Sequence, residues 1–356
     1  MYPLPKRESR VRPWISSPKG GVMTTRADVA KLAGVSESTV SYVLSGKRPI
    51  GEETRKRVLA AIEETGYKSN YAAAALAGGS PRLVTMMISN LFSEPSSRII
   101  GELVNGVVDG VSEAGFHSVI WPISEDEKSD VNTLLKSNFS GGVILMNTSE
   151  SDLRVRALHR EKIPFVVLGR TNVNFKYNFV DRDFEERDRI ALTRLKELGH
   201  SHIGVLTYEA HLRPNLLKMA ESLGLRVYPL AAKNTYEGGA EVAQSIRTSH
   251  RQVTAVISVL DAATIGFVEC AEDSGFTIPA DISVIGLNML ESQAASSKPQ
   301  VSTVAYDAYD MAKSCGKMMV EAIEATSDQR VYKSELWAGD FVDRGSISTA
   351  RKKASR

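Results

Sequence analysis

One short stretch, residues 36–42, carries hydrogen-bonding side chains on a helical pattern. Its candidates for direct contact with another molecule are Ser36, Glu37, Ser38, Thr39, Ser41 and Tyr42. Ser38 and Tyr42 share a face, because residues four apart lie one helical turn from each other. A glutamate can accept a hydrogen bond from cytosine, and a serine can bond several bases. The stretch is therefore a candidate for reading base edges in a nucleic acid.

The preceding residues position this stretch through a helix and a tight turn. A first helix is expected to open at Thr25, whose hydroxyl can cap it, with Asp28 completing a variant of the capping box. Gly34 permits the sharp turn that a bulkier residue would resist. Ser36 then caps the second helix, which the pattern places at 37–44.

A third helix, about 52–65, is expected to pack on the other two and to stop at Gly66. The side chains expected to face inward are Val29, Ala30, Ala33, Val40, Val43, Leu44, Val58, Leu59 and Ile62. Three short helices with a tight turn between the first two predict a helix-turn-helix, whose second helix enters the DNA major groove. The alternative is a three-helix bundle that serves packing only.

The charge distribution favours DNA over a bundle of that kind. Residues 1–80 hold 13 Lys and Arg against 7 Asp and Glu, a net charge of +6. The remainder holds 31 against 35, a net charge of −4, so the whole chain carries +2. A cationic head on a mildly acidic body suits phosphate binding by one end of the molecule.

This head resembles the DNA-binding head of the LacI/GalR family of bacterial transcription regulators. The similar residues are DVAKLAGVSESTVSYVLSG, then EETRKRVLAAIEETGY, then Asn70, Ala73 and Leu76. The resemblance implies a helix-turn-helix domain at 23–68, with Thr25 and the side chains of 36–42 contacting DNA. It also implies a hinge helix and linker at 69–80, where Leu76 matches the leucine that wedges into the minor groove.

The hinge stretch itself departs from the family pattern at two positions. Ser69 stands where proline is frequent, and Ala74 stands where arginine or glutamine is frequent. Taken alone, YAAAALAGG favours an alanine-rich linker helix, since alanine favours helix, and only its position after the third helix favours the hinge. Before the head, residues 1–22 are rich in Pro, Gly, Ser and Arg without periodicity. We expect them to form a disordered basic extension; a basic arm touching phosphates is the alternative.

Beyond residue 80 strands and helices alternate. Strands are expected at 83–89, 117–122, 141–146, 164–169, 177–181, 202–208, 225–230, 254–260 and 281–288, and helices at 98–114, 129–138, 151–161, 184–199, 214–223, 237–248 and 262–274. Such alternation predicts parallel α/β sheets. There are too many strands for one sheet, so two Rossmann-like lobes with a cleft between them are expected. Ligands bind such sheets beyond the carboxyl ends of the strands.

The family resemblance continues over 81–346, through ELGHSHIGVL, YEGGA, DAATIGFVECAEDSGFTIPADISVIGLN, KPQVSTV and FVDRGS. It implies an effector-binding and dimerisation core similar to periplasmic sugar-binding proteins, with three crossings between its lobes. The effector would be a small molecule, a sugar or another metabolite. The last residues, 347–356, lack a leucine heptad, so a flexible tail and a homodimer are expected.

Polar residues at strand ends should choose the effector. Matching positions suggest Ser89, Phe92, Glu94, Glu186, Asp261, Asn288 and Tyr306. Asn288 stands where the family usually has aspartate, and Leu212 stands at the clamping arginine, with Arg213 one residue away. Asp261 could equally cap the helix that follows it. Two interpretations remain: an effector other than a typical free sugar, or a vestigial cleft with control by a protein partner.

Other functions have little support in the sequence. A G-x-G-x-x-G after the first strand and a G-x-x-x-x-G-K-[ST] are both absent, which argues against a Rossmann-type enzyme, and no cofactor is expected. The pair His200 and His202 is expected at the surface rather than on a metal. There is no signal peptide for a transported solute-binding protein and no run of 18 apolar residues for a membrane span. Cys270 and Cys315 are expected to be buried free thiols, which indicates a cytoplasmic, nucleoid-associated protein.

Overall fold

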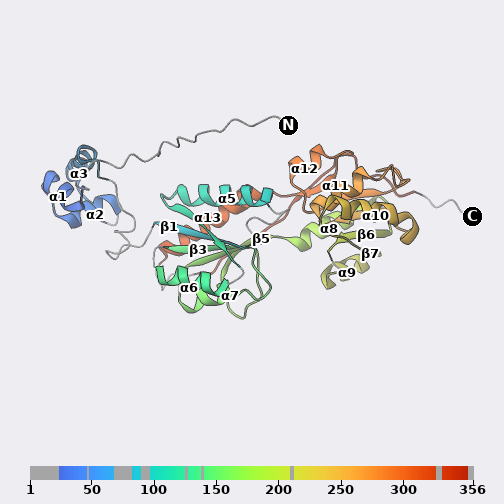
Figure 1. Cartoon of the computed structure of the whole chain (residues 1–356), viewed down its shortest axis with the longest axis horizontal. Coiled ribbons are helices and arrows are strands. Elements are labelled where there is room, and N and C mark those ends of the chain that lie inside the picture. The colour runs from blue at the N-terminus through green and yellow to red at the C-terminus, as the bar shows by residue number, and fades with distance from the viewer. Residues whose placement is uncertain are drawn as a thin grey trace, which may run out of the picture. The chain divides into compact units, whose positions relative to one another are not determined.

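The chain forms two compact units, Met1–Gly78 and Gly79–Arg356, in a computed structural model (Figure 1). The structure describes residues 24–45, 48–67, 82–89, 97–124, 127–137, 140–208, 212–325 and 331–351. Several expectations lie outside these residues: the extension 1–22, the hinge 69–80 with Asn70, Ala73 and Leu76, and the cleft candidates Phe92 and Glu94.

Three helices make up the first unit: α1 (Arg26–Ala33), α2 (Glu37–Ser45) and α3 (Glu52–Thr65). The expected capping box is present, since the Asp28 amide donates to Thr25 Oγ1 at 3.3 Å and the Thr25 amide donates to Asp28 Oδ2 at 2.8 Å. Hydrogen bonds from Thr25 lower the pKa of the Asp28 carboxyl. Gly34 and Gly66 end α1 and α3 with φ of 62°, a conformation that favours glycine.

The core of this head is small and made of short side chains. Val29, Ala30, Ala33, Val40, Val58 and Ala61 are buried, with Val43 and Ile62 packed against them. Two expected core residues are exposed: Leu44 at 42% and Leu59 at 48%. In α3 the buried face follows 58, 61 and 62, the helical spacing of three and four, so Ala61 takes the place that the sequence reading gave to Leu59.

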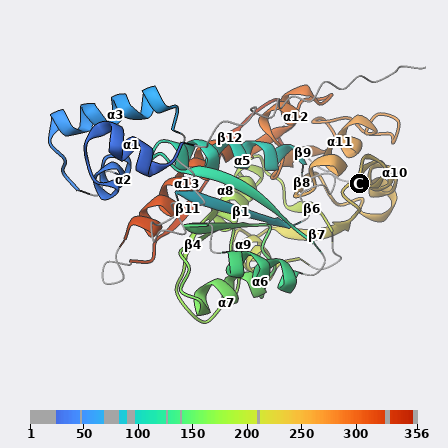
Figure 2. The ribbon, with the colours of Figure 1, turned by 60° about the vertical axis from the view of Figure 1, so that its left-hand side comes forward.

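The second unit begins with a six-stranded sheet in the order β11-β5-β4-β3-β1-β2, with every neighbouring pair parallel. Its strands are β1 (Leu83–Ser89), β2 (His117–Ile123), β3 (Gly142–Met146), β4 (Phe165–Leu168), β5 (Asn178–Arg182) and β11 (Ser334–Trp337). One face packs on α5 (Ser97–Ser112) and α13 (Ala308–Glu324), the other on α6 (Glu127–Ser137) and α7 (Leu153–Arg160) (Figures 1 and 2). We call this layered body lobe 1.

Lobe 2 repeats the plan with the order β12-β10-β9-β8-β6-β7, in which only β12 runs antiparallel to its neighbour. Its strands are β6 (His202–Thr207), β7 (Arg226–Ala231), β8 (Ala255–Ser258), β9 (Ser283–Gly286), β10 (Ser302–Ala305) and β12 (Asp340–Val342). Its helices are α8 (Phe184–Glu197), α9 (Pro214–Ser222), α10 (Tyr236–Ser249), α11 (Asp261–Glu269) and α12 (Glu291–Ser296). The expected architecture of two parallel α/β lobes is therefore confirmed.

The chain passes between the lobes three times: from β5 to α8, from β10 to α13, and from β11 to β12. The first two passages leave β5 and β10, and the third joins the edge strands β11 and β12, which pair with β5 and β10, so the connections run side by side. Short connections of this kind tie the lobes together at the carboxyl ends of β5 and β10. The same ends are where open parallel sheets bind ligands.

Glycines let two helix pairs approach unusually closely. A Cβ placed on Gly106 of α5 would lie 2.2 Å from the carbonyl oxygen of Tyr309 in α13. Between α10 and α11, a Cβ on Gly239 would lie 1.9 Å from the carbonyl oxygen of Ala263. Such distances leave no room for any side chain, so these glycines are required by packing.

The C-terminal residues correct two expectations. The chain was expected to be flexible from 347, but Ile347 is buried and the Ala350 amide donates to the Leu198 carbonyl at 2.8 Å. His200, expected at the surface, is only 3% exposed and bonds Thr254 Oγ1 at 2.8 Å and the Ser348 carbonyl at 3.0 Å. Burial lowers the pKa of His200. The described residues 347–351 are therefore packed on lobe 2, where the buried imidazole of His200 helps to hold them.

The remaining sequence expectations on the core concern thiols and membrane spans. Both cysteines are free; Cys315 is buried, but Cys270 is only half-buried, with its sulfur 3.6 Å from the Tyr236 hydroxyl. Burial raises the pKa of the Cys315 thiol. Among the described helices, none combines the length and the apolar character that a membrane span needs.

Candidate nucleic-acid interface and ligand cleft

The outer face of α2 presents an ordered set of hydroxyl groups. Ser36 caps the helix, since the Thr39 amide donates to its Oγ at 3.2 Å. The same Oγ lies 2.7 Å from Ser38 Oγ and 2.9 Å from Thr39 Oγ1. Glu37 and Ser38 are exposed. The cap therefore fixes the position of the Ser38 hydroxyl on the surface that the sequence predicted for base contacts.

Tyr42 lies at the end of this face, beside a cation. The guanidinium of Arg48 lies 5.4 Å from the centre of the Tyr42 ring, within cation–π range. Ser41 and Tyr42 are partly exposed. Exposed cations of the described head also include Lys31, Arg55, Lys56 and Arg57. A face with hydroxyls, one carboxylate, one phenol and nearby cations can hydrogen-bond base edges and attract phosphates.

In the second unit, a cavity of about 520 Å³ opens at the carboxyl ends of β6, β8 and β9. Its lining comprises Phe184, Arg187, Asp188, Val205, Thr207, Tyr208, Leu212, Arg213, Leu216, Ile257, Val259, Leu287 and Asn288. This is the edge at which parallel sheets bind ligands, and the size suits a small molecule. Among the sequence-predicted effector residues, Asn288 lines the cavity.

Phe184, the first residue of α8, is surrounded by guanidinium groups from both lobes. The Cζ atoms of Arg170, Arg182, Arg187 and Arg213 lie 5.9, 4.8, 5.0 and 5.9 Å from the centre of its ring. Arg170 and Arg182 come from the ends of lobe 1 strands, and Arg187 and Arg213 from lobe 2 helices or their caps. Cation–π contacts on one ring therefore gather four positive charges at the cleft.

Carboxylates offset part of this charge. Arg170 Nε lies 2.6 Å from Asp181 Oδ2, and Arg187 Nη2 lies 2.6 Å from Asp188 Oδ1. Arg213 also pairs with Asp188. Burial lowers the pKa of Arg187, Asp188 raises it, and the neighbouring cations Arg182 and Arg213 lower it further.

Asn288 connects the two lobes. Its Oδ1 accepts from Arg182 Nη1 at 3.0 Å and from Arg187 Nη1 at 2.8 Å, while its Nδ2 donates to the Val259 carbonyl at 2.7 Å. Arg182 belongs to the last strand before the first crossing, and Arg187 to the helix after it. The amide is thus fixed by three bonds and touches the guanidinium groups of both lobes.

Two other predicted cleft residues lie near the strand ends. The Arg182 guanidinium lies 5.0 Å from the centre of the Tyr306 ring, and burial raises the pKa of that phenol. Ser89 ends β1 with 7% exposure, and its buried Oγ has no hydrogen-bond partner among the residues that the structure describes. Tyr306 therefore belongs to the arginine cluster.

Glu186 and Asp261 do not line the cavity in the described part of the chain. Glu186 pairs with Arg189 on the outer side of α8, and that contact lowers the pKa of Glu186. Asp261 accepts from Asn234 Nδ2 at 2.7 Å and from Gln293 Nε2 at 3.2 Å. Both carboxylates are thus engaged with neighbours rather than facing the cavity.

The alternative helix-capping role for Asp261 is wrong. Helix α11 starts at Asp261 itself and ends at Glu269, earlier than expected. The Ala262 and Ala263 amides, in the first turn of the helix, donate to Asn234 Oδ1 at 3.0 and 3.2 Å. The cap comes from a residue in another loop, which sequence adjacency could not reveal.

The sequence analysis missed the main charged residues of the cleft. Arg182, Phe184, Arg187 and Asp188 all lie in the segment VDRDFEERDR, which follows a strand. The many charged residues after a strand end did indicate a possible ligand site. However, five consecutive charged residues on a helix point to different sides, so the sequence could not show which of them face the cleft. Arg213 was noticed one residue from the expected arginine, and the structure shows both Leu212 and Arg213 at the cavity.

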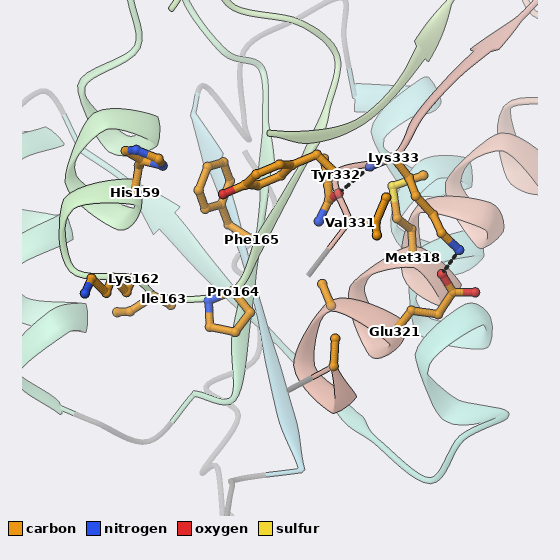
Figure 3. Close-up of a pocket in the computed structure, with 13 residues that line it drawn as sticks. His159, Lys162, Ile163, Pro164, Phe165, Met318, Glu321, Val331, Tyr332 and Lys333 are labelled. Carbon is orange, nitrogen blue, oxygen red and sulfur yellow. Dashed lines mark hydrogen bonds and ion pairs between the residues drawn. The ribbon is translucent and has the colours of Figure 1, made fainter. Parts of the chain in front are cut away.

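A second cavity, of about 650 Å³, lies in lobe 1 at the opposite, amino end of its strands (Figure 3). Its lining includes Phe165 at the start of β4, Tyr332 just before β11, and Met318 of α13. Of the two lysines in the lining, Lys162 and Lys333, the second is paired with Glu321 at 2.6 Å, as the dashed line in Figure 3 shows. The described lining lacks a charge cluster like that around Phe184, so the first cavity is the better candidate for an effector.

The described residues hold no cluster of three or more His, Cys, Asp or Glu side chains that could bind a metal ion.

A three-helix head with a helix-turn-helix and a two-lobed core with a ligand cavity define a ligand-responsive DNA-binding protein. Comparison with known families agrees. Residues 25–70 match the family described as bacterial regulatory proteins, lacI family, and residues 192–347 match the periplasmic binding protein-like domain. The chain is a LacI-family transcription regulator with a periplasmic-binding-protein-like effector domain.

Individual relatives cover nearly the whole chain. The transcriptional regulator AglR of Rhizobium meliloti is 29% identical over 337 residues, which are 90% of this chain and 94% of that protein. The lac repressor dimer bound to operator and an anti-inducer has a similar fold, with a TM-score of 0.70, 21% identity, and coverage of 91% of this chain and 99% of that one. The complex of the regulator CelR with cellobiose gives a TM-score of 0.64 at 24% identity, with the same two coverages.

Proposed function

We propose that this regulator is a repressor that binds a palindromic operator as a homodimer and is controlled by a small molecule in the cleft. The observation that carries the proposal is the pairing of two parts in one chain: a capped helix α2 with an exposed polar face, and a ligand-sized cavity at the carboxyl ends of β6, β8 and β9. The lac repressor, which shares the fold, is a dimer on its operator.

In the proposed complex, α2 of each protomer lies in a major-groove half-site. Glu37, Ser38 and Tyr42 face the bases, with Thr25, Ser36, Thr39 and Ser41 around them. Head cations neutralise phosphates, which makes binding strongly salt-dependent. Asn70, Ala73 and Leu76 belong to a hinge in which the two copies of Leu76 open the central base step. A palindrome follows from the two-fold symmetry of the dimer.

Control by the effector uses the contact between the lobes. Asn288 accepts hydrogen bonds from Arg182 of lobe 1 and Arg187 of lobe 2, so any ligand that competes for these guanidinium groups changes how the lobes are held. A ligand can shift the equilibrium only by its differential affinity for the two lobe arrangements. A formed cavity with charged walls supports a small-molecule effector over a vestigial cleft controlled by a protein partner.

The proposal is tested by selecting operators from random DNA with the full chain. The expected product is a palindrome bound by two protomers, with an affinity that falls steeply as salt rises. Leu76→Ala should weaken binding to the selected site and remove the bend in a gel permutation assay. Leu153→Ala, a matched change at an exposed position of lobe 1, should do neither. A bend that persists in Leu76→Ala would contradict the hinge assignment.

A further inference from the structure

We propose that the effector is a small organic anion, with a carboxylate or phosphate held by Arg182, Arg187 and Arg213 and an apolar part against the wall of the cavity. The inference rests on the proposed function, because it names the chemical class of the molecule that the same cleft takes.

Four guanidinium groups surround Phe184, but only two carboxylates pair with them in the described part of the chain. Asp181 pairs with Arg170, and Asp188 is shared between Arg187 and Arg213. Arg182 has no carboxylate partner among the described residues; its guanidinium meets Asn288 Oδ1 and the rings of Phe184 and Tyr306. The cluster therefore keeps positive charge that a bound oxyanion would neutralise.

Three other acids of the surrounding elements are engaged with other partners. Glu186 is paired with Arg189, and Glu185 accepts from Asn215 Nδ2 at 2.6 Å. Asp261 accepts from Asn234 and Gln293. Burial and the mutual repulsion of the cations both disfavour the charged form of Arg187, which is reflected in its lowered pKa. A ligand anion would relieve that repulsion.

Asn288 preserves this excess charge. A carboxylate in its place would receive the same two hydrogen bonds from Arg182 and Arg187 and would neutralise the cluster from within. The amide oxygen instead orients both guanidinium groups without cancelling their charge. The arginines are thus held in place before the ligand arrives, which reduces the entropy lost on binding.

The cavity wall explains why a neutral sugar fits poorly. Six lining residues are aliphatic: Val205, Leu212, Leu216, Ile257, Val259 and Leu287. Asp188 is the only carboxylate in the described lining, and it already pairs with Arg187 and Arg213. A polyhydroxylated ring needs several free acceptors for its hydroxyl groups. The observed lining offers cations and apolar surface instead, which suits an anion with a compact apolar part.

The first test measures oxyanion binding to the full chain by thermal shift. Orthophosphate, at about ten millimolar, should raise the melting temperature above that in sodium chloride of equal ionic strength, because binding to the folded state stabilises it. The rise should be lost in Arg182→Gln and in Asn288→Asp, and should persist in Arg189→Gln. Arg189 is the matched control, because it lies on the same helix α8 and pairs with Glu186 outside the cavity.

Asn288→Asp distinguishes loss of the site from loss of the fold. The new carboxylate would pair with Arg182 and Arg187, so the melting temperature without ligand should stay equal or rise while the response to phosphate disappears. Equal responses to phosphate in the wild type, Arg182→Gln and Asn288→Asp would overturn the inference, and so would the absence of any response in the wild type.

A second test uses pairs of compounds that differ in charge on one skeleton. The pairs are glucose with glucuronate and glucose 6-phosphate, and benzyl alcohol with benzoate and benzyl phosphate. We expect the anion of at least one set to bind about tenfold or more tightly than its neutral partner, as expected for the gain of a charge-assisted hydrogen bond. The anion that binds more tightly shows whether the site prefers a carboxylate or a phosphate. If the neutral compounds bind as well as the anions, or if no anion binds, the inference fails.

Failure of this inference and failure of the proposed function give different results. If neutral sugars bind in the cleft and release the selected operator, the effector is not an anion, but the regulatory function stands. If the full chain binds no operator while anions still bind the cleft, the proposed function fails and the anion site stands. Gel retardation on the same protein preparations supplies this distinction.

Discussion

Replacing glycine by alanine at two positions of α5 should change stability in opposite directions. At Gly106 the new methyl group would lie 2.2 Å from the Tyr309 carbonyl oxygen and 2.9 Å from Ala312 Cβ. An ordinary contact begins near 3.4 Å, so α5 and α13 would have to separate by roughly 1 Å. At Gly101, in the same helix, nothing lies within 4 Å of the added Cβ.

The magnitudes follow from two competing effects. Alanine gains about 1 kcal/mol over glycine inside a helix. Overpacking against a backbone that cannot move aside costs about 3 kcal/mol, the upper end of the usual range. Gly106→Ala should therefore lower the free energy of unfolding by about 2 kcal/mol, and Gly101→Ala should raise it by about 1 kcal/mol.

Urea unfolding of the two variants and the wild type, followed by circular dichroism, measures this difference. The midpoints should move in opposite directions at an unchanged m-value, because the surface exposed on unfolding is the same. If both variants are stabilised, the close contact between α5 and α13 is absent in solution and the reasoning fails. If both variants are destabilised equally, the close contact at Gly106 does not explain the loss of stability, and the reasoning also fails.

Two other predictions address single contacts. Asn234→Ala removes the acceptor for the Ala262 and Ala263 amides, so the free energy of unfolding measured in urea should fall by about 1–2 kcal/mol. Asn215→Ala, at an exposed position of α9, is the control and should lower it much less. Because burial lowers the pKa of His200 below 6.5, the unfolded chain binds the proton more readily, so stability is full above pH 6.5 and falls as the pH drops below it. The slope from this residue is at most about 1.4 kcal/mol per pH unit, and it should disappear in His200→Gln when urea midpoints at pH 7.5 and 5.5 are compared; an unchanged slope would mean that other groups cause it.

The head could be predicted from the sequence almost completely. Thr25 and Asp28 form the capping box, Gly34 and Gly66 take positive φ, and the boundaries of α1 and α3 lie within a residue or so of those expected. These features depend on residues fewer than five apart, so local geometry decides them. The two errors, Leu44 and Leu59, concern which side of a helix meets its neighbours, and packing decides that.

In the core, the strands and the alternating helices were predictable as well, because buried apolar runs and helical periods are local patterns. The elements that the sequence reading did not place include α12, α13, β11 and β12. Strands β11 and β12 are short and belong to different lobes, so each is stabilised by a sheet assembled from other parts of the chain. Short segments such as α12, β11 and β12 carry too few residues for a periodic signal, whereas α13, with 17 residues, is long enough to show one and was overlooked.

By itself, therefore, the sequence determined the class of most elements, the cationic head and the alternation of strands and helices, since all of these are set by neighbours along the chain. Only the tertiary structure decided which charges meet at the cleft. Arg187 reaches Asn288 across 101 residues of sequence, and Glu186 beside it turns to Arg189. The physical reason is that adjacent residues on a helix point about 100° apart. Which of them faces the ligand depends on how the helix packs against a sheet built from distant strands.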